Sequence, residues 1–496
     1  MNELKKSQRI VLITLCTLTS VSFLYVYYHI CNDRYDLNMF MRTLFTAAIS
    51  FTAYFFLSKY NGFLEKHYIK IVAAFLGTML ILQIIFGYFL EITPQFDFEN
   101  IYKGAISWAE TGTFPNPGDY YFYFPNNLGG LWLLSIVFRI AGFFQIENYY
   151  MAATVTNALM NVTMMLLCFC ICRKLTSIKN GIFVLFIFMV SLPSYFGASV
   201  FYTDVLTMLF PVLFYYLYLK FREAKDQKWQ VVYLVLMGLT AWVGMSIKFT
   251  VVIITVAIAI ELILRLEFKR LLFGVVVIAA VYMICNASFY HMIYSDHLDQ
   301  ETAENMKLPP THWIMMGLQG DGDYNAEDAA FSGSFDDPDE RKDAIFEKIK
   351  QRISDYGAAG LFDLATRKAV KCFSDGTYEL NAFFGHGMVR DTVLNDYITA
   401  EGEHYEQYQT FCSGVFLGFI FLMAIGGLGH LYQYKNGDFT SLPYITPLLA
   451  VFGIMLFLAM WETHPRYITN YIPLIYICAA TGMEFLSKIR IRMFLK

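Results

Sequence analysis

The sequence predicts an all-α polytopic membrane protein with about 12 transmembrane helices, outer-face juxtamembrane helices and a large outer loop. Of its 496 residues, 57% are hydrophobic and only 16% are charged, whereas soluble domains carry about 25% charged residues. The mean hydropathy is +0.45. A soluble globular fold is therefore excluded. The lipid bilayer is the expected environment, and no nucleic acid is expected as a partner.

Runs of about 20 apolar residues mark the expected spans. The first run follows Lys5, Lys6 and Arg9 and lacks a small-residue cleavage site, so it is expected to be a retained signal anchor. The expected limits are 10–30, 38–58, 69–90, 149–172, 181–198, 203–220, 229–247, 249–266, 270–290, 410–432, 441–461 and 467–487.

One further apolar segment, 128–144, decides the orientation of the chain. If it crossed the membrane, three clusters of Lys and Arg at 173–179, 220–228 and 265–270 would lie outside, against the positive-inside rule. If it lies flat or re-enters on the outer side, all three clusters lie inside. We therefore expect 128–144 to be juxtamembrane, and both termini to be cytoplasmic in a plasma-membrane protein.

Three regions follow from this pattern. Residues 1–290 form an N-terminal transmembrane module with a first outer loop, 91–127. Residues 291–409 form an extracytoplasmic loop, and residues 410–496 form a C-terminal transmembrane module. Within the second loop, Ile345, Ile349 and Ile353 recur at helical spacing and predict an amphipathic helix over 338–356, followed by a second over 361–373.

The connections expected in the cytoplasm are short and contain no P-loop or dinucleotide fingerprint. Use of ATP or a nucleotide-sugar from the inside is therefore not expected, and no cofactor is indicated. DGDYNAED at 321–328 begins like a calcium loop, but it has Ala326 at the sixth position and Ser332 at the twelfth. No metal site is predicted.

Charged residues within or at the ends of spans are functional candidates. Here they occur in four separate segments, all at outer ends in the expected orientation. They are Asp97 and Glu99, Asp204, Lys248, and His464 with Arg466.

The two aspartates each have two interpretations. Asp97 can act as a general base on an acceptor hydroxyl, with Glu99 beside it, or it can cap a helix that begins near Glu99 or Asn100. Asp204 opens a span and can be a site residue, a helix cap or both.

The basic candidates also have alternatives. Lys248 can contact a phosphate or carboxylate, or it can extend to the interface. Arg466 is the stronger phosphate candidate, because its planar fork of donors suits phosphate oxygens. His312, beside Trp313 in PPTHWIMMGL, is more typical of interfacial packing than of a ligand.

Together these motifs resemble the GT-C fold glycosyltransferases, which include protein O-mannosyltransferases and bacterial aminoarabinose transferases. The resemblance lies in QFDFEN (95–100), Tyr102, YFYFPNN (121–127), FYTD (201–204) and HPRY (464–467). It implies transfer of a sugar from a polyprenyl-phosphate donor to a cell-envelope glycan, lipid or protein acceptor on the outer face, with Asp97 as base. The acidic pair departs from adjacent carboxylates, since Phe98 separates Asp97 from Glu99.

Two other functions fit part of the pattern. A transporter or flippase of lipid-linked sugars would also bury charges, but it should show repeat symmetry and charges near the midplane. A polymerase or ligase of surface polysaccharide would use closely related chemistry.

Overall fold

The fold is helical throughout the part of the chain that the computed structural model describes, residues 6–34, 37–114, 120–385, 387–435 and 444–494. Within those residues no strand forms, and the extended contact is an isolated antiparallel bridge between Ile92 and Met388. The all-α prediction is confirmed.

Eight helical segments among the described residues are long and apolar enough to cross a membrane, and each corresponds to an expected span. The third begins at Asn61, before the expected residue 69. They are α1 (Lys6–His29), α2 (Leu37–Lys59), α3 (Asn61–Phe89), α7 (Tyr149–Leu175), α10 with α11 (Thr203–Leu206 and Leu209–Glu223), α12 (Gln227–Ile247), α14 (Phe268–Asp296) and α21 (Tyr405–Lys435).

The expected span 181–198 is broken. It forms α8 (Ile178–Val190) and then α9 (Pro193–Phe196) with η3 (Gly197–Ser199), at an angle of 81°. Proline has no N–H to bond the carbonyl four residues earlier, and its ring crowds that carbonyl. The carbonyl in question, that of Met189, accepts instead from the Tyr195 hydroxyl at 2.7 Å.

Two more expected spans form helices that are shorter than predicted. Among the described residues, fewer helices are therefore long and apolar enough to cross a membrane than the predicted number of about 12. The expected span 249–266 is η4 (Phe249–Val251) with α13 (Val252–Leu264), and 441–461 is α22 (Ile445–Met460). Residues 441–443 lie outside the described part of the chain. The last expected span, 467–487, consists of the 3-10 segment η6 (Pro465–Tyr471) followed by α23 (Ile472–Phe494).

The first outer loop contains α4 (Phe96–Thr111), α5 (Tyr120–Tyr123) and η2 (Pro125–Asn127), and α6 (Leu128–Phe143) follows. α4 begins before the expected Asn100 and ends where Gly112 takes a left-handed φ of 75°. α6 covers the ends of two long helices. Its Trp132 packs on Trp242 of α12 at 5.2 Å, and its Phe138 packs on Tyr149 of α7 at 5.1 Å.

The described part of the second loop contains five short helices and one long one. The short ones are α15 (Gln300–Met306), α16 (Thr311–Gly317), α17 (Ala326–Gly333), α19 (Asn381–Phe384) and α20 (Asn395–Ile398); the long one is α18 (Pro338–Ser374). α18 breaks at Gly357, where φ is 56° and ψ is −178°. The two predicted amphipathic helices are the two arms of α18. Ile345 and Ile349 are buried as expected, whereas Ile353 is 44% exposed.

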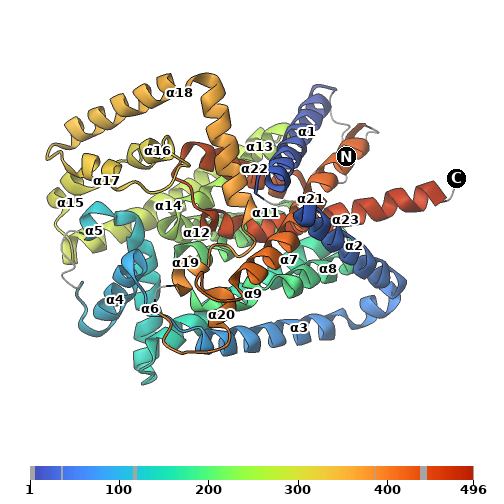
Figure 1. Cartoon of the computed structure of the whole chain (residues 1–496), viewed down its shortest axis with the longest axis horizontal. Coiled ribbons are helices and arrows are strands. Elements are labelled where there is room, and N and C mark those ends of the chain that lie inside the picture. The colour runs from blue at the N-terminus through green and yellow to red at the C-terminus, as the bar shows by residue number, and fades with distance from the viewer. Residues whose placement is uncertain (1–5, 35–36, 115–119, 386, 436–443, 495–496) are drawn as a thin grey trace.

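The two outer loops are joined to each other. Thr93 N donates to Gly387 O and Val389 N donates to Glu91 O, each at 2.9 Å, on either side of the Ile92–Met388 bridge. Arg390 adds a bond to Tyr88 O at 2.7 Å. In Figure 1, α4, α5, α15 and α17 lie on the left, whereas both ends of the chain lie on the right.

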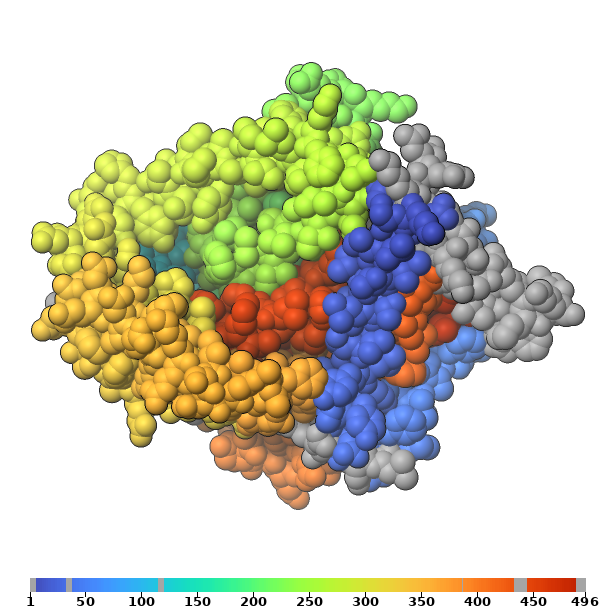
Figure 2. Space-filling model, turned by 90° about the horizontal axis from the view of Figure 1, so that it is seen from above, coloured from blue at the N-terminus to red at the C-terminus, as the bar shows by residue number. Residues whose placement is uncertain are grey.

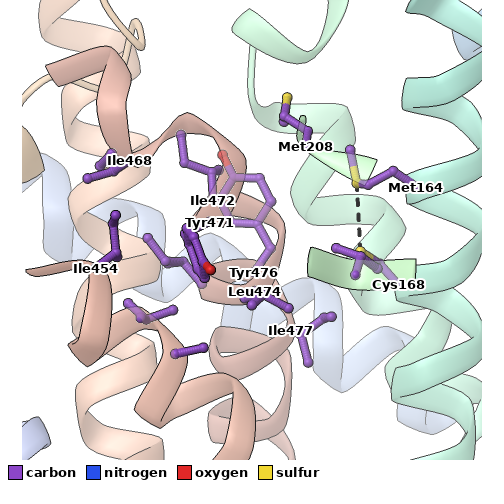
Figure 3. Close-up of a cluster of buried hydrophobic side chains, with 14 of the residues drawn as sticks. Met164, Cys168, Met208, Ile454, Ile468, Tyr471, Ile472, Leu474, Tyr476 and Ile477 are labelled. Carbon is purple, nitrogen blue, oxygen red and sulfur yellow. Dashed lines mark hydrogen bonds between the residues drawn. The ribbon is translucent and has the colours of Figure 1, made fainter. Parts of the chain in front are cut away.

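The end of η6 and the start of α23 lie inside the bundle. Tyr471, Ile472, Tyr476 and Ile477 are buried, and Figure 3 draws them across from Met164 and Cys168 of α7. Seen from above, α22 in red lies between α18 in orange and the yellow-green α13 and α14 (Figure 2). This packing holds η6 at the end of the bundle from which the second loop emerges.

Candidate functional site

Asp97 lies in the first turn of α4 and is held by two tyrosines. The Tyr120 hydroxyl donates to its Oδ1 at 2.9 Å, and the Tyr202 hydroxyl donates to its Oδ2 at 3.5 Å. The Asn127 amide donates in turn to the Tyr120 oxygen at 2.6 Å. Burial, followed by the nearby carboxylate, raises the pKa of both phenols, so they remain donors at neutral pH.

The alternative that Asp97 caps the helix is wrong. α4 begins at Phe96, and the N-cap position belongs to Gln95. Phe96 itself has φ 55°, a left-handed conformation that is rare for a bulky residue. The backbone therefore turns sharply at the residue that precedes the carboxylate.

Asp204 and Lys248 form a buried ion pair. Asp204 is 2% exposed and lies inside α10, whose N-cap position is Tyr202, so it does not cap that helix. Lys248 is the C-cap residue of α12, and its side chain is 14% exposed. It pairs inward with Asp204 and lies 4.5 Å from the Tyr467 ring centre, so it does not extend to the interface.

Arg466 bridges two carboxylates that come from different parts of the chain. Its Nε lies 3.6 Å from Asp204 Oδ2, and its Nη1 lies 3.4 Å from Glu379 Oε2. Its backbone N–H also donates to Glu379 Oε2 at 3.2 Å. Burial opposes its charge, but Tyr467 and Glu379 keep the pKa of the guanidinium above its ordinary value.

His464 lies between two acidic side chains. Its Nδ1 is 3.2 Å from Glu379 Oε1, and its Nε2 is 3.6 Å from Glu462 Oε1. Burial opposes ionisation of Glu379, but hydrogen bonding from His464 and the charge of Arg466 lower its pKa below the ordinary value. Burial raises the pKa of Glu462. The two glutamates on either side of the imidazole therefore have pKa values moved in opposite directions.

Glu379 and Glu462 are the site residues that the sequence prediction missed. Glu462 stands within WETHPRY, two residues before His464, and could have been included with that motif. No sequence motif indicated Glu379, because it contacts His464 and Arg466, which lie 85 and 87 positions later in the chain. Tyr378 and Glu379 have φ values of 62° and 56°. Consecutive left-handed non-glycine residues are strained, and such strain is often found at functional sites.

The second outer loop fixes the segment that carries these groups. Lys368 of α18 is buried and donates to the carbonyls of Gly317, Ala459 and Trp461 at 2.9, 3.1 and 2.7 Å. Burial lowers its pKa to about 8. Tyr378 bonds Tyr476 of α23, and the Tyr476 hydroxyl donates to Ser191 Oγ at 2.9 Å. The strained turn is thereby attached to the core.

Three predicted site residues lie outside this cluster. Glu99 pairs with Lys103 on the exposed side of α4. Tyr102 is an aromatic packing residue, with ring centres 5.7 Å from both Phe138 and Phe201. His312 is 2% exposed, and its Nδ1 lies 2.7 Å from Ser332 Oγ. Burial lowers the pKa of His312 to about 4.

The arrangement combines an accessible carboxylate with buried charge pairs. Asp97, Asp204, Glu379 and Glu462 supply four carboxylates, whereas Lys248 and Arg466 supply two basic groups. Burial, followed by the charge of Arg466, lowers the pKa of Lys248 well below its ordinary value, so Arg466 is the more secure cation. An incoming oxyanion must therefore share these cations with Asp204 and Glu379. Within the described residues, no group of three or more His, Cys, Asp or Glu side chains is arranged to hold a metal ion.

The fold and this site define an integral membrane protein with an ionisable cluster beside two loops that are joined to each other. Residues 10–485 match the model of the family described as "Conserved hypothetical integral membrane protein", and the chain belongs to that family. Among curated proteins, none matches this chain.

Two solved structures are similar to the chain in fold. For the oligosaccharyltransferase AglB from Archaeoglobus fulgidus, in complex with an inhibitory peptide and a dolichol-phosphate, the TM-score is 0.41 and the identity 11%, over 87% of this chain. This chain spans only 52% of AglB. For ArnT from Cupriavidus metallidurans bound to undecaprenyl phosphate, the TM-score is 0.39 and the identity 9%, over 84% of this chain and 78% of ArnT. Likeness at this level does not assign an activity or a substrate.

Proposed function

We propose that the protein is a membrane glycosyltransferase, which moves a sugar from a polyprenyl-phosphate donor to a hydroxyl of a cell-envelope glycan, lipid or protein on the outer face. The observation that carries the proposal is the placement of Asp97. Its carboxylate is held by Tyr120 and Tyr202. The Tyr202 ring and the Arg466 guanidinium both pack on Phe383, at 5.6 and 5.9 Å from its ring centre. The tyrosine that holds the candidate base and the candidate cation therefore share one aromatic neighbour.

Each group has a role in this chemistry. Asp97 takes the proton of the acceptor hydroxyl as that oxygen attacks the anomeric carbon. The bond from the anomeric carbon to the phosphate oxygen breaks, and the lipid phosphate leaves with the bonding electrons. Negative charge grows on that oxygen, so a cation beside it stabilises the transition state more than the ground state. Arg466 is the first candidate for this cation, and Lys248 is the second.

Arg466 is available for this role without a large rearrangement. Arg466 uses Nε and Nη1 toward its two carboxylates, and a guanidinium has five N–H donors. The remaining donors can bind phosphate while Asp204 and Glu379 hold the group in place. The Phe383 and Tyr467 rings, 5.9 and 5.3 Å from the guanidinium carbon, restrict its rotation.

The test supplies purified protein with polyprenyl-phosphate sugars labelled in the sugar, together with extracted envelope polymers and lipids. We expect label to appear in one acceptor fraction with wild-type protein and with Glu99→Gln, and not with Asp97→Asn. Glu99→Gln is the matched control, because Glu99 lies on the same helix but pairs outward with Lys103. Movement of the intact lipid-linked sugar between leaflets of a vesicle, without transfer, would identify a flippase instead. The absence of both results with every donor would contradict the proposal.

A further inference from the structure

A large apolar cavity lies between α11, α12, α13 and α14, and along α12 it extends from Leu234 to Met245. Its volume is about 310 Å³. Met237 and Ala241 of α12, Ile258 of α13 and Ala279 of α14 are among the side chains that line it. Arg270, at the start of α14, is the one charged residue among those lining it.

The cavity exists because α14 packs closely on only one neighbour. A Cβ at Gly238 of α12 would lie 2.7 Å from Val281 of α14, so these two helices touch there. Elsewhere α14 is open to its surroundings. Only 6% of the residues in its most apolar 18-residue stretch are buried, whereas the corresponding share is 78% in the segment Thr203–Glu223. Between α14 and α13 the side chains do not close the space.

Such a space inside a bilayer favours an apolar chain over water. Apolar cavities do not hold water well, because a buried water needs polar partners. Of the groups lining this one, Arg270, Thr255, Tyr218 and Tyr282 are polar, and the others are apolar side chains or Gly274. The helices around it face lipid, so the chains of membrane lipids have direct access.

The charge at the rim of the cavity indicates which class of lipid binds in it. Residues 220–228 and 261–270 contain seven basic and four acidic residues, a net charge of +3. Arg270 is paired with Glu267 at 2.8 Å, but its side chain is 45% exposed, and Glu267 is shared with Arg222 at 3.4 Å. Basic groups at the end of an apolar space between spans suit an anionic headgroup.

We propose that this cavity binds an acyl chain of an anionic phospholipid, with the lipid phosphate at Arg270. The site is separate from the candidate transfer site. Lys248 follows the last residue of α12, whereas Arg270 lies near the other end of that helix, because α13 returns the chain across the bundle. The 21 residues of α12 correspond to about 30 Å. The cavity itself reaches Met245, three residues before Lys248, so the two sites are separated by where the lipid phosphate lies. A lipid whose phosphate is at Arg270 cannot place that phosphate at Lys248, and the inference does not depend on the proposed function.

Photochemical labelling tests the proposal. The full-length protein in nanodiscs is exposed to phosphatidylglycerol that carries a diazirine in one acyl chain, or to phosphatidylcholine with the same chain. We expect phosphatidylglycerol to label peptides of α12–α14 that line the cavity, in preference to phosphatidylcholine. Arg270→Gln should reduce this preference by about fivefold, as expected for one basic contact worth about 1 kcal/mol.

Two tryptophan substitutions on one helix separate the cavity from the general lipid surface. Ala279→Trp fills the cavity and should abolish most of the labelling, whereas Val276→Trp, at a lipid-facing position that is 58% exposed and does not line the cavity, should leave it unchanged. If Ala279→Trp does not elute as a monodisperse protein, Ala279→Leu replaces it. Equal labelling by both lipids, or labelling unaffected by filling the cavity, would overturn the proposal. Displacement of the label by polyprenyl phosphate would do so as well, because it would assign the cavity to the donor.

Discussion

At the scale of single residues, Asp97 is the position where a change has the clearest expected result. Asp97→Asn keeps the shape of the side chain and an oxygen that can accept from Tyr120, so the local structure should persist. It removes the base, and we expect the rate of transfer to fall by about 100-fold or more, with donor affinity largely unchanged. Single-turnover rates and donor binding, measured in parallel, check this. Normal turnover by the variant would exclude Asp97 as the base.

The proposed role of Arg466 depends on the planar arrangement of its guanidinium donors as well as on its charge. Nε and Nη1 meet Asp204 and Glu379 respectively, and a lysine ammonium cannot reproduce both contacts. Arg466→Lys should lower the rate at saturating donor by about 10-fold or more, as for loss of one transition-state contact, and Arg466→Ala should be worse. Arg466→Ala also removes the guanidinium from Glu379 and leaves buried Asp204 with Lys248 as its partner, which destabilises the fold.

Thermal stability in detergent therefore accompanies every rate measured for Arg466 variants. If Lys248 touches the phosphate, Lys248→Ala should chiefly raise the donor concentration that gives the half-maximal rate. Wild-type turnover by Arg466→Ala at every donor concentration would place the phosphate elsewhere.

His312 predicts a pH dependence in the second outer loop. Burial lowers its pKa from an ordinary value of 6.5 to about 4, although the carboxylate of Asp328 acts in the opposite direction. The unfolded segment therefore binds a proton more readily than the folded one. The stability that the folded segment gains by burying neutral His312 is complete above pH 6.5 and is lost as the pH falls toward 4. The protection factors of the amides in α16 and α17, which compare the observed exchange rate with the intrinsic rate at the same pH, should fall over this range, and His312→Gln should remove most of this pH dependence. Exchange with the same pH profile in that variant would show that another group titrates.

At the scale of elements, the contact between α6 and α12 depends on one glycine. A Cβ at Gly129 would lie 2.0 Å from Ser246 O and 2.9 Å from Ile247 N, both backbone atoms. These atoms cannot move as a flexible side chain can, so Gly129→Ala must displace α6 or the end of α12 beside Lys248. We expect a loss of about 1–3 kcal/mol of stability, typical of overpacking, together with weaker activity.

Gly130→Ala is the matched control for this substitution. Its Cβ would lie 3.7 Å from the nearest atom, Ile101 Cγ2, which is ordinary contact. The two variants differ by one position in the same helix and carry the same added methyl group. Equal melting temperatures for both would show that α6 and α12 are farther apart than in this structure.

At the scale of the whole molecule, the testable feature is the orientation in the membrane. The basic clusters at 173–179, 220–228 and 265–270 predict that this end faces the cytoplasm. Cysteines placed singly at Lys225 and Asp336, in a background in which accessible native cysteines are replaced, should differ in reaction with an impermeant thiol reagent. Only the cysteine at 336 should react in intact cells. Reaction at 225 alone, or at both positions, would reverse the orientation and place the charged cluster inside.

The sequence by itself determined the class of fold and most of the helices, because apolar run length and Lys/Arg placement are local properties. It also identified Asp97, Asp204, Lys248, His464 and Arg466, since charges at the ends of spans are conspicuous in an apolar chain. Only the tertiary structure decided how they pair. Glu379 joins them through a strained turn that no local pattern marks, and Glu99 and His312 turn away from them. The physical reason is that the contacts within the cluster join distant positions, 44 residues apart for Asp204 and Lys248 and 105 residues apart for Asp97 and Tyr202. Asp204 and Arg466 are still farther apart in the sequence, and the geometry of all these contacts depends on how the helices pack.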